Sequence, residues 1–218
     1  MESVIALIGF GEAGSTFAKA AGWESAALAF DLNPARRSVM EEAGVVACAT
    51  AECALSDADM VLSLVTADSA LPAAQDYAAL LKLRAIWCDM NSVAPDTKRA
   101  AAKAITAAGG RYVDVAVLAP VHPARMNVPL LLAGPAAEDA AVALGALGFT
   151  NIRVVGSEVG RASAIKMIRS VMVKGIEALT AEMMLAAEAA GVADEVLASL
   201  DASDKPKSWA EKAAYNLE

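Results

Sequence analysis

The sequence predicts an α/β fold of the Rossmann type, a doubly wound and mostly parallel sheet followed by a long helix and a short all-α C-terminal region. Two observations carry this expectation. Apolar runs typical of strands alternate with helical patterns as far as residue 155, and strand signals cease after Gly156. We therefore expect two parts, residues 1–156 and residues 157–218.

Eight apolar runs have the length and composition of strands. They are Val4–Ile8, Ala26–Phe30, Val45–Ala47, Met60–Val65, Ala85–Cys88, Tyr112–Val117, Pro129–Ala133 and Ile152–Val155. The intervening segments predict helices at about 12–21, 35–43, 68–81, 95–108 and 137–147. Alternation of this kind is typical of a parallel sheet with helices on both faces.

The region after Gly156 has a helical period. Apolar side chains recur at steps of three and four, which predicts one helix over about 162–190. They are Ile165, Ile168, Met172, Ile176, Leu179 and Met183. Shorter helices are expected at about 194–200 and 208–215, on either side of the polar segment "DASDKPKS". So few residues follow the long helix that we expect a subunit interface to complete its packing.

A glycine-rich turn joins the first strand to the first helix. In "GFGEAG", Gly9, Gly11 and Gly14 match G-x-G-x-x-G, with Phe10, Glu12 and Ala13 between them. Asp31 ends the second strand at the distance where an acidic residue binds the adenosine ribose. The alternative is a strand-to-helix turn without a ligand. The context favours a dinucleotide site, which makes residues 1–156 a dinucleotide-binding domain.

The sequence gives opposing indications of whether the dinucleotide is NAD or NADP. Asp31 repels a 2′-phosphate and so favours NAD, whereas Arg36 and Arg37 follow closely and could bind that phosphate in NADP. Exposed arginines on a helix are also common as solvated side chains. We expect NAD, with NADP possible.

Charge and hydropathy exclude several other classes. The formal net charge of −8 disfavours nucleic acid as a partner. The longest apolar run, Ala140 to Phe149, is too short to span a bilayer, and Glu2 stands where an export signal carries positive charge. We therefore expect no membrane segment and a cytoplasmic location.

The potential metal ligands are few. Cys48, Cys53 and Cys88 form no C-x-x-C pair, and His122 is the single histidine. This pattern favours ordinary thiols over a disulfide framework or a zinc site, so we expect no metal.

Five motifs in order resemble the β-hydroxyacid dehydrogenase family, the group related to 6-phosphogluconate dehydrogenase. They are "GFGEAG", Asp31, "LSLVTADSA", "DMNSVAPDTKRAAAKAITAAGGRYVDVAV" and "GRASAIKMIRS". The last looks closest to a phosphogluconate dehydrogenase-like branch of unassigned substrate. The resemblance implies an NAD(P)-dependent enzyme that transfers hydride between nicotinamide and the hydroxyl-bearing carbon of a small hydroxy acid or a related alcohol or carbonyl compound.

The resemblance also implies roles for single residues. Lys166, soon after Gly160, takes the place of the family's proton-transferring lysine, although an ordinary helix lysine has the same spacing. Ser170 stands where the family has a substrate-orienting asparagine. For the cofactor, the resemblance implies contacts from Leu64, Val65, Ser69 and Ser92.

The chain departs from the family in its substrate loop and its length. Where the family has D-x-P-V-S-G-G, this chain reads "DVAVLAP", so Leu118 replaces the serine of the anion cradle. His122 and Arg125 are the next groups able to meet a polar substrate, although a loop histidine is often a plain surface residue. The family's further C-terminal helices, which also imply a homodimer, are shortened here. Two alternatives stay open, a related C=N reductase and a non-catalytic NAD(P)-binding protein.

Overall fold

The computed structural model describes residues 4–203 and 208–217. Its internal contacts form two compact units, one that ends at Ile168 and one that begins at Arg169. The first unit thus extends past residue 156, the boundary expected from the sequence, because the next turns of helix pack on the sheet. In that packing, Ala162 and Ile165 contact Ala116 and Leu131.

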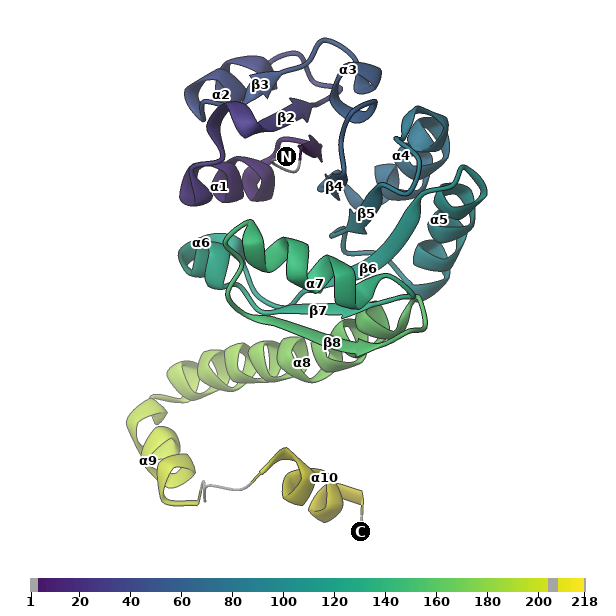
Figure 1. Cartoon of the computed structure of the whole chain (residues 1–218). Coiled ribbons are helices and arrows are strands. Elements are labelled where there is room, and N and C mark those ends of the chain that lie inside the picture. Colours follow the sequence, from purple (N-terminus) through teal and green to yellow (C-terminus); the bar gives the residue numbers. More distant parts are fainter. Residues whose placement is uncertain (1–3, 204–207, 218) are drawn as a thin grey trace. The chain divides into compact units, whose positions relative to one another are not determined.

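A single sheet organises the first unit (Figure 1). Its eight strands in the described residues lie in the order β3-β2-β1-β4-β5-β6-β7-β8. Their bounds are β1 (Ile5–Ile8), β2 (Ala27–Phe30), β3 (Val46–Ala47), β4 (Met60–Ser63), β5 (Ile86–Asp89), β6 (Arg111–Val117), β7 (Leu130–Ala133) and β8 (Ile152–Gly156). Neighbouring strands are parallel except β6 and β7, which are antiparallel.

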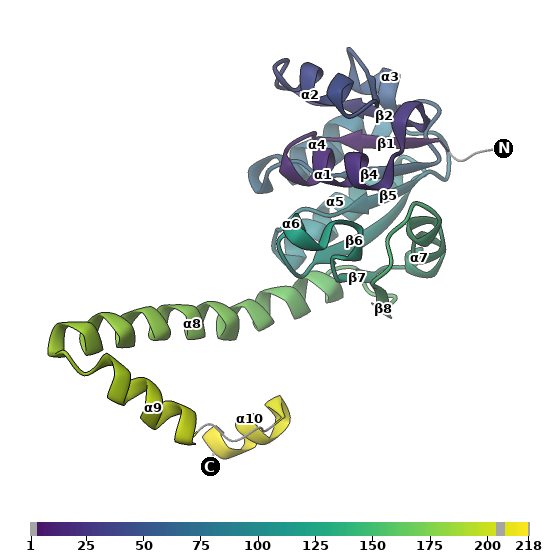
Figure 2. The same cartoon turned by 90° about the vertical axis from the view of Figure 1, so that its left-hand side faces the viewer.

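Helices cover both faces of this sheet. One hydrophobic core joins β1 and β4 to α1 (Glu12–Ala21), α2 (Arg36–Glu42) and α7 (Ala137–Ala146). The other joins them to α3 (Ala51–Leu55), α4 (Ala70–Tyr77) and α5 (Pro95–Ala107). In Figure 2, α1 lies in front of the sheet, and the fainter α4 and α5 lie behind it. The predicted Rossmann-type fold is confirmed, because a mostly parallel sheet is covered on both faces.

The sequence patterns missed the shortest elements. These are α3, α6 (Val121–Ala124) and the 3-10 turns η1 (Glu24–Ala26) and η4 (Arg125–Asn127). The helix predicted at about 68–81 is present but divided into η2 (Ala67–Ser69), α4 and η3 (Ala78–Leu80). Elements of three to five residues are too short to show a helical period. The start of α3 did carry a signal, since Thr50 accepts a hydrogen bond from the Cys53 backbone N–H as an N-cap.

The described residues of the second unit contain helices and no strand. The long helix α8 (Arg161–Ala190) continues into it from the first unit and is followed by α9 (Ala193–Ser203) and α10 (Trp209–Leu217). Part of the expected polar linker, residues 204–207, lies outside the described residues. On α8, the side chains of Ile168 and Leu179 are 74% and 68% exposed. None of the described helices combines the length and apolar character needed to cross a membrane.

Candidate cofactor-binding and active site

The glycine turn after β1 has the close contacts that its spacing predicts. Gly9 has a φ of +90°, and a Cβ there would lie 2.6 Å from the Leu64 carbonyl oxygen. A Cβ on Gly14 would lie 2.9 Å from the Gly9 carbonyl oxygen. By contrast, a Cβ on Gly11 would have no atom within 4 Å. Gly9 and Gly14 therefore allow β1, α1 and the end of β4 to approach, while Gly11 faces open space.

Asp31 fixes the same turn from the end of β2. Its Oδ2 accepts a hydrogen bond from the Phe10 N–H at 2.7 Å, and its Oδ1 accepts one from the Asn33 N–H at 2.8 Å. A carboxylate offers about four acceptor positions, so Asp31 can still bind two hydroxyl groups. The residue both shapes the turn and presents acceptors beside it.

A cavity of about 520 Å³ opens at the carboxyl ends of β1, β2 and β4. Most of the predicted cofactor residues line it, namely Gly9, Gly11, Glu12, Asp31, Leu64, Val65 and Ser69. Phe10, Ala13 and Gly14 belong to the same turn and helix, although they are not part of the lining. Arg36 lines the cavity as well, whereas Arg37 lines a separate cavity and pairs with Glu41 at 3.5 Å.

These residues fit a dinucleotide. The start of α1 at Gly11 and Glu12 offers backbone N–H groups and a positive helix end to phosphates, and the absent side chain of Gly11 leaves room for them. Asp31 would bind the ribose hydroxyls. Beyond β5, the buried Asn91 Oδ1 has no hydrogen-bond partner in the described part of the chain. A buried acceptor of this kind suits a donor from a bound ligand.

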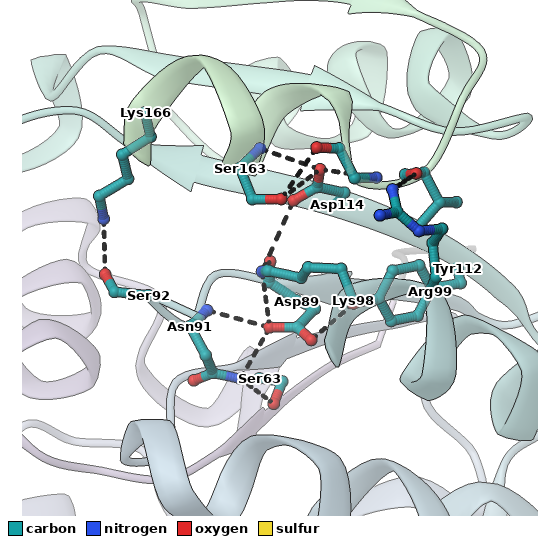
Figure 3. A network of polar contacts seen from close by, with 12 residues as sticks. Ser63, Asp89, Asn91, Ser92, Lys98, Arg99, Tyr112, Asp114, Ser163 and Lys166 are labelled. Carbon is teal, nitrogen blue, oxygen red and sulfur yellow. Dashed lines mark hydrogen bonds and ion pairs between the residues drawn. The ribbon is translucent and has the colours of Figure 1, made fainter. Parts of the chain in front are cut away.

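Lys166 and Ser92 meet across two elements (Figure 3). The Lys166 ammonium, on the second turn of α8, donates to Ser92 Oγ at 2.5 Å, and Ser92 lies in the loop after β5. Burial, and then the charge of Lys98, lower the pKa of Lys166 from the ordinary lysine value. The structure thus joins two residues that the resemblance assigned to catalysis and to the cofactor.

Sequence reasoning missed the polar network beside this pair (Figure 3). Lys98, Asp89 and Asp114 are each fully buried, and Lys98 Nζ lies 2.9 Å from Asp89 Oδ1 and 3.7 Å from Asp114 Oδ1. A signal for it exists in the sequence. Acidic residues interrupt two apolar strands, in "WCD" and "YVDVAV", and two buried carboxylates require a buried cation.

None of the predicted substrate residues is among those that line the cofactor cavity. His122 Nε2 lies 2.9 Å from Thr16 Oγ1 on α1, and with Arg125 and Lys19 it lines a second cavity of about 360 Å³. Leu118 donates its N–H to the Pro129 carbonyl and packs near β6 and β7. Ser170 lies one turn after Lys166 on α8, in the second unit.

The cysteines and acidic residues form no metal site in the described ranges. No group of three or more histidine, cysteine, aspartate or glutamate side chains there could hold a metal ion. Cys48, Cys53 and Cys88 are free thiols, and the Cys53 thiol donates to the Cys48 sulfur.

Residues 4–156 match the profile of the NAD-binding domain of 6-phosphogluconate dehydrogenase. The chain belongs to this family. The match covers the sheet from β1 to β8 and includes the glycine turn and the residues that line the 520 Å³ cavity. The predicted family and the NAD(P)-binding character of the domain are therefore confirmed.

Some relatives share a third or more of the aligned residues, or nearly so. An uncharacterised 28.5 kDa protein of Methanothermus fervidus is 32% identical over 153 residues, which are 70% of this chain and 57% of that protein. The alignment thus spans less than two thirds of that relative. A conserved hypothetical protein of Sinorhizobium meliloti is 41% identical with a TM-score of 0.78, over 99% of this chain and 74% of that structure.

More distantly similar structures share the fold. The 3-hydroxyisobutyrate dehydrogenase of Mycobacterium tuberculosis, solved with L-serine, is 20% identical with a TM-score of 0.82, over 96% of this chain and 73% of that structure. An imine reductase of Myxococcus stipitatus in complex with NADP⁺ is 22% identical with a TM-score of 0.76, over 90% and 70% of the two chains. At these identities the likeness is one of fold alone, and the fold occurs in both a dehydrogenase and an imine reductase.

Proposed function

We propose that the chain is an NAD(P)-dependent oxidoreductase acting on CH–OH, with a small hydroxy acid or a related alcohol or carbonyl compound as substrate. The observation that carries the proposal is the Lys166–Ser92 contact of 2.5 Å, in the same unit as the dinucleotide-type cavity. The family match supports the cofactor, and the lowered pKa of Lys166 supports proton transfer.

A dinucleotide held by the glycine turn and Asp31 would supply hydride-transfer chemistry when bound. Lys166 handles the accompanying proton: in reduction its ammonium donates to the carbonyl oxygen, and in oxidation its neutral amine accepts from the substrate hydroxyl. Ser92 accepts a hydrogen bond from Lys166 and so fixes the direction of Nζ. Burial lowers the pKa of Lys166, which keeps both protonation states accessible nearer neutral pH.

We assign the substrate side to Leu118, His122 and Ser170. The cavity lined by Lys19, His122 and Arg125 supports contact with an anionic group, because three basic side chains meet there in an acidic protein. Leu118 stands in place of the serine of the family's anion cradle. It supports a substrate whose polar group is bound by other residues than in the family members that have this serine. We also propose a homodimer formed through the C-terminal helices and a cytoplasmic location.

The test has two stages. Energy transfer from the three tryptophans to NADH or NADPH measures binding, and no signal with either cofactor contradicts the proposal. A screen of hydroxy acids, aldehydes and ketones, and cyclic imines then follows the absorbance of the reduced cofactor. Lys166→Ala is compared with Lys103→Ala, an exposed lysine on α5. We expect only Lys166→Ala to lose turnover. Turnover of imines alone, unaffected by Lys166→Ala, would favour the C=N reductase.

A further inference from the structure

Two buried carboxylates face each other in the middle of the sheet. The register of the parallel strands β5 and β6 pairs Asp89 with Asp114, and both side chains are fully buried. Like charges directly opposite on neighbouring strands destabilise a sheet, and burial removes the water that would screen them. A cation between the two carboxylates would offset this repulsion.

Lys98 supplies that cation from an unusual position. It lies in the first turn of α5, which begins at Pro95, where the positive end of the helix dipole disfavours a basic side chain. Its Nζ nevertheless donates to the Asp89 carbonyl at 2.6 Å and to Asp89 Oδ1 at 2.9 Å. The contacts with the two carboxylates, rather than helix stability, account for a lysine here.

Each carboxylate accepts hydrogen bonds from the segment just before one member of the Lys166–Ser92 pair. Asp89 Oδ1 accepts from the Asn91 N–H at 3.0 Å and from the Asn91 side chain at 2.8 Å, which fixes the turn leading into Ser92. A hydrogen bond of 2.6 Å from the Tyr112 hydroxyl holds the other oxygen of Asp89.

Asp114 accepts hydrogen bonds from the segment just before Lys166. Its Oδ2 accepts from the Gly160 N–H at 3.1 Å and from the Ser163 N–H at 3.1 Å. The Ser163 hydroxyl adds a third hydrogen bond, of 3.2 Å. These contacts fix the first turn of α8, just before Lys166. Figure 3 shows this arrangement, with Lys98 between the two carboxylates.

We propose that Lys98 is a positioning residue for the Lys166–Ser92 pair: it bridges Asp89 and Asp114, joins the loop of Ser92 to the start of α8, and sets the electrostatic field at Lys166. The inference rests on the proposed role of Lys166 in proton transfer. The charged groups of this network are Lys98 from α5, Asp89 from β5 and Asp114 from β6. Lys98 is the cation that contributes to the lowered pKa of Lys166.

The test measures the basicity of Lys166 directly and needs no substrate. The full-length protein is acetylated with trace acetic anhydride between pH 7 and pH 11, and mass spectrometry quantifies the peptide that contains Lys166. Lys98→Met removes the cation with little change in volume and raises the pKa of Lys166. Because one pKa unit changes the neutral fraction about tenfold, we expect roughly three- to tenfold slower acetylation of Lys166 below its pKa.

Asp114→Asn changes the field in the opposite sense. The amide oxygen still accepts from Gly160 and Ser163, but the charge of Lys98 is less neutralised, so acetylation of Lys166 becomes faster at the same pH. A purely structural role would move both variants in one direction, toward the reactivity of an exposed lysine. Opposite shifts therefore support the proposal, and equal shifts or none overturn it.

Two controls complete the test. Lys82→Met removes a lysine that pairs with Asp59 at the surface, and it should leave the reactivity of Lys166 unchanged. If circular dichroism shows that Lys98→Met does not fold, Asp114→Asn decides alone: faster acetylation supports the proposal, and unchanged or slower acetylation overturns it. Should Lys166→Ala keep full turnover, the proposed function fails while the labelling result still stands.

Discussion

Asp31 Oδ2 accepts a hydrogen bond from the Phe10 N–H at 2.7 Å, so the end of β2 holds the glycine turn that follows β1. The register of β1 and β2 explains the contact, because Ile8 pairs with Phe30 and the next residues leave the sheet together. One carboxylate therefore shapes the turn and also faces the cavity in which we place the adenosine ribose.

Asp31→Asn should weaken NADH binding and reduce the preference for NADH over NADPH. The amide loses the charge that repels a 2′-phosphate and accepts fewer hydrogen bonds from the ribose. We expect a loss of about 1–3 kcal/mol for NADH and a smaller loss for NADPH. Fluorescence titration with both cofactors measures the ratio. Asp57→Ala, an exposed aspartate after α3, serves as the control, and an unchanged ratio in Asp31→Asn would contradict the assignment.

Gly9→Ala and Gly11→Ala should separate stability from binding. At Gly9 a Cβ meets the Leu64 carbonyl oxygen at 2.6 Å, and the φ of +90° adds backbone strain of about 1–3 kcal/mol, so the Tm should fall markedly. Gly11 has a φ of −79° and open space, so the Tm should change little while cofactor affinity falls. Differential scanning fluorimetry without cofactor checks both. Equal Tm values for the two variants would be inconsistent with this geometry.

The pH dependence of turnover should differ between the two directions. Oxidation needs neutral Lys166, so its kcat/KM rises with pH and levels off below the ordinary lysine value of 10.5, because the pKa is lowered. Reduction needs the ammonium, so its kcat/KM falls as pH rises through the same pKa. Stopped-flow rates in both directions measure this, once a substrate is known. If kcat/KM changed with pH in the same sense for oxidation and reduction, the result would contradict proton transfer by Lys166.

Ser92→Ala should lower kcat by about tenfold, or about 1.4 kcal/mol, because Lys166 Nζ loses the acceptor that orients it. Ser92→Thr keeps the hydroxyl and should restore most of the rate. Steady-state kinetics with saturating cofactor distinguish this from weaker binding. A loss in Ser92→Thr equal to that in Ser92→Ala would argue against orientation by the hydroxyl.

Leu179→Glu should dissociate the proposed dimer. Leu179 is 68% exposed on α8, in the apolar series that the sequence places on one helix stripe. Sedimentation velocity at micromolar concentration should find a dimer for the wild type and a monomer for the variant. Glu177→Ala, an exposed position on the same helix, is the control. A monomeric wild type would contradict the proposal.

The sequence predicts the fold well because both of its signals are local. The eight strands and the long helices follow from hydrophobic period, and the glycine turn follows from the spacing of Gly9, Gly11 and Gly14. Contacts between segments that are distant in the sequence are harder to predict, because no local pattern indicates them. The resemblance gave Lys166 and Ser92 separate roles, and their hydrogen bond was not predicted. No pattern within its own helix indicates that Lys98 is buried, because the two carboxylates that it meets belong to the strands β5 and β6.

The hydrogen bonds from Gly160 and Ser163 to Asp114 also set the rotational phase of α8. Each residue turns an α-helix by about 100°, so one inserted residue between Ser163 and Lys166 would carry the ammonium about a quarter of the way round the helix. Deletions have the same effect in the other sense. The spacing of three residues from Ser163 to Lys166 is therefore fixed, because even an insertion close to a whole turn, which restores the phase, would move the ammonium by about 5.4 Å along the helix axis and away from Ser92.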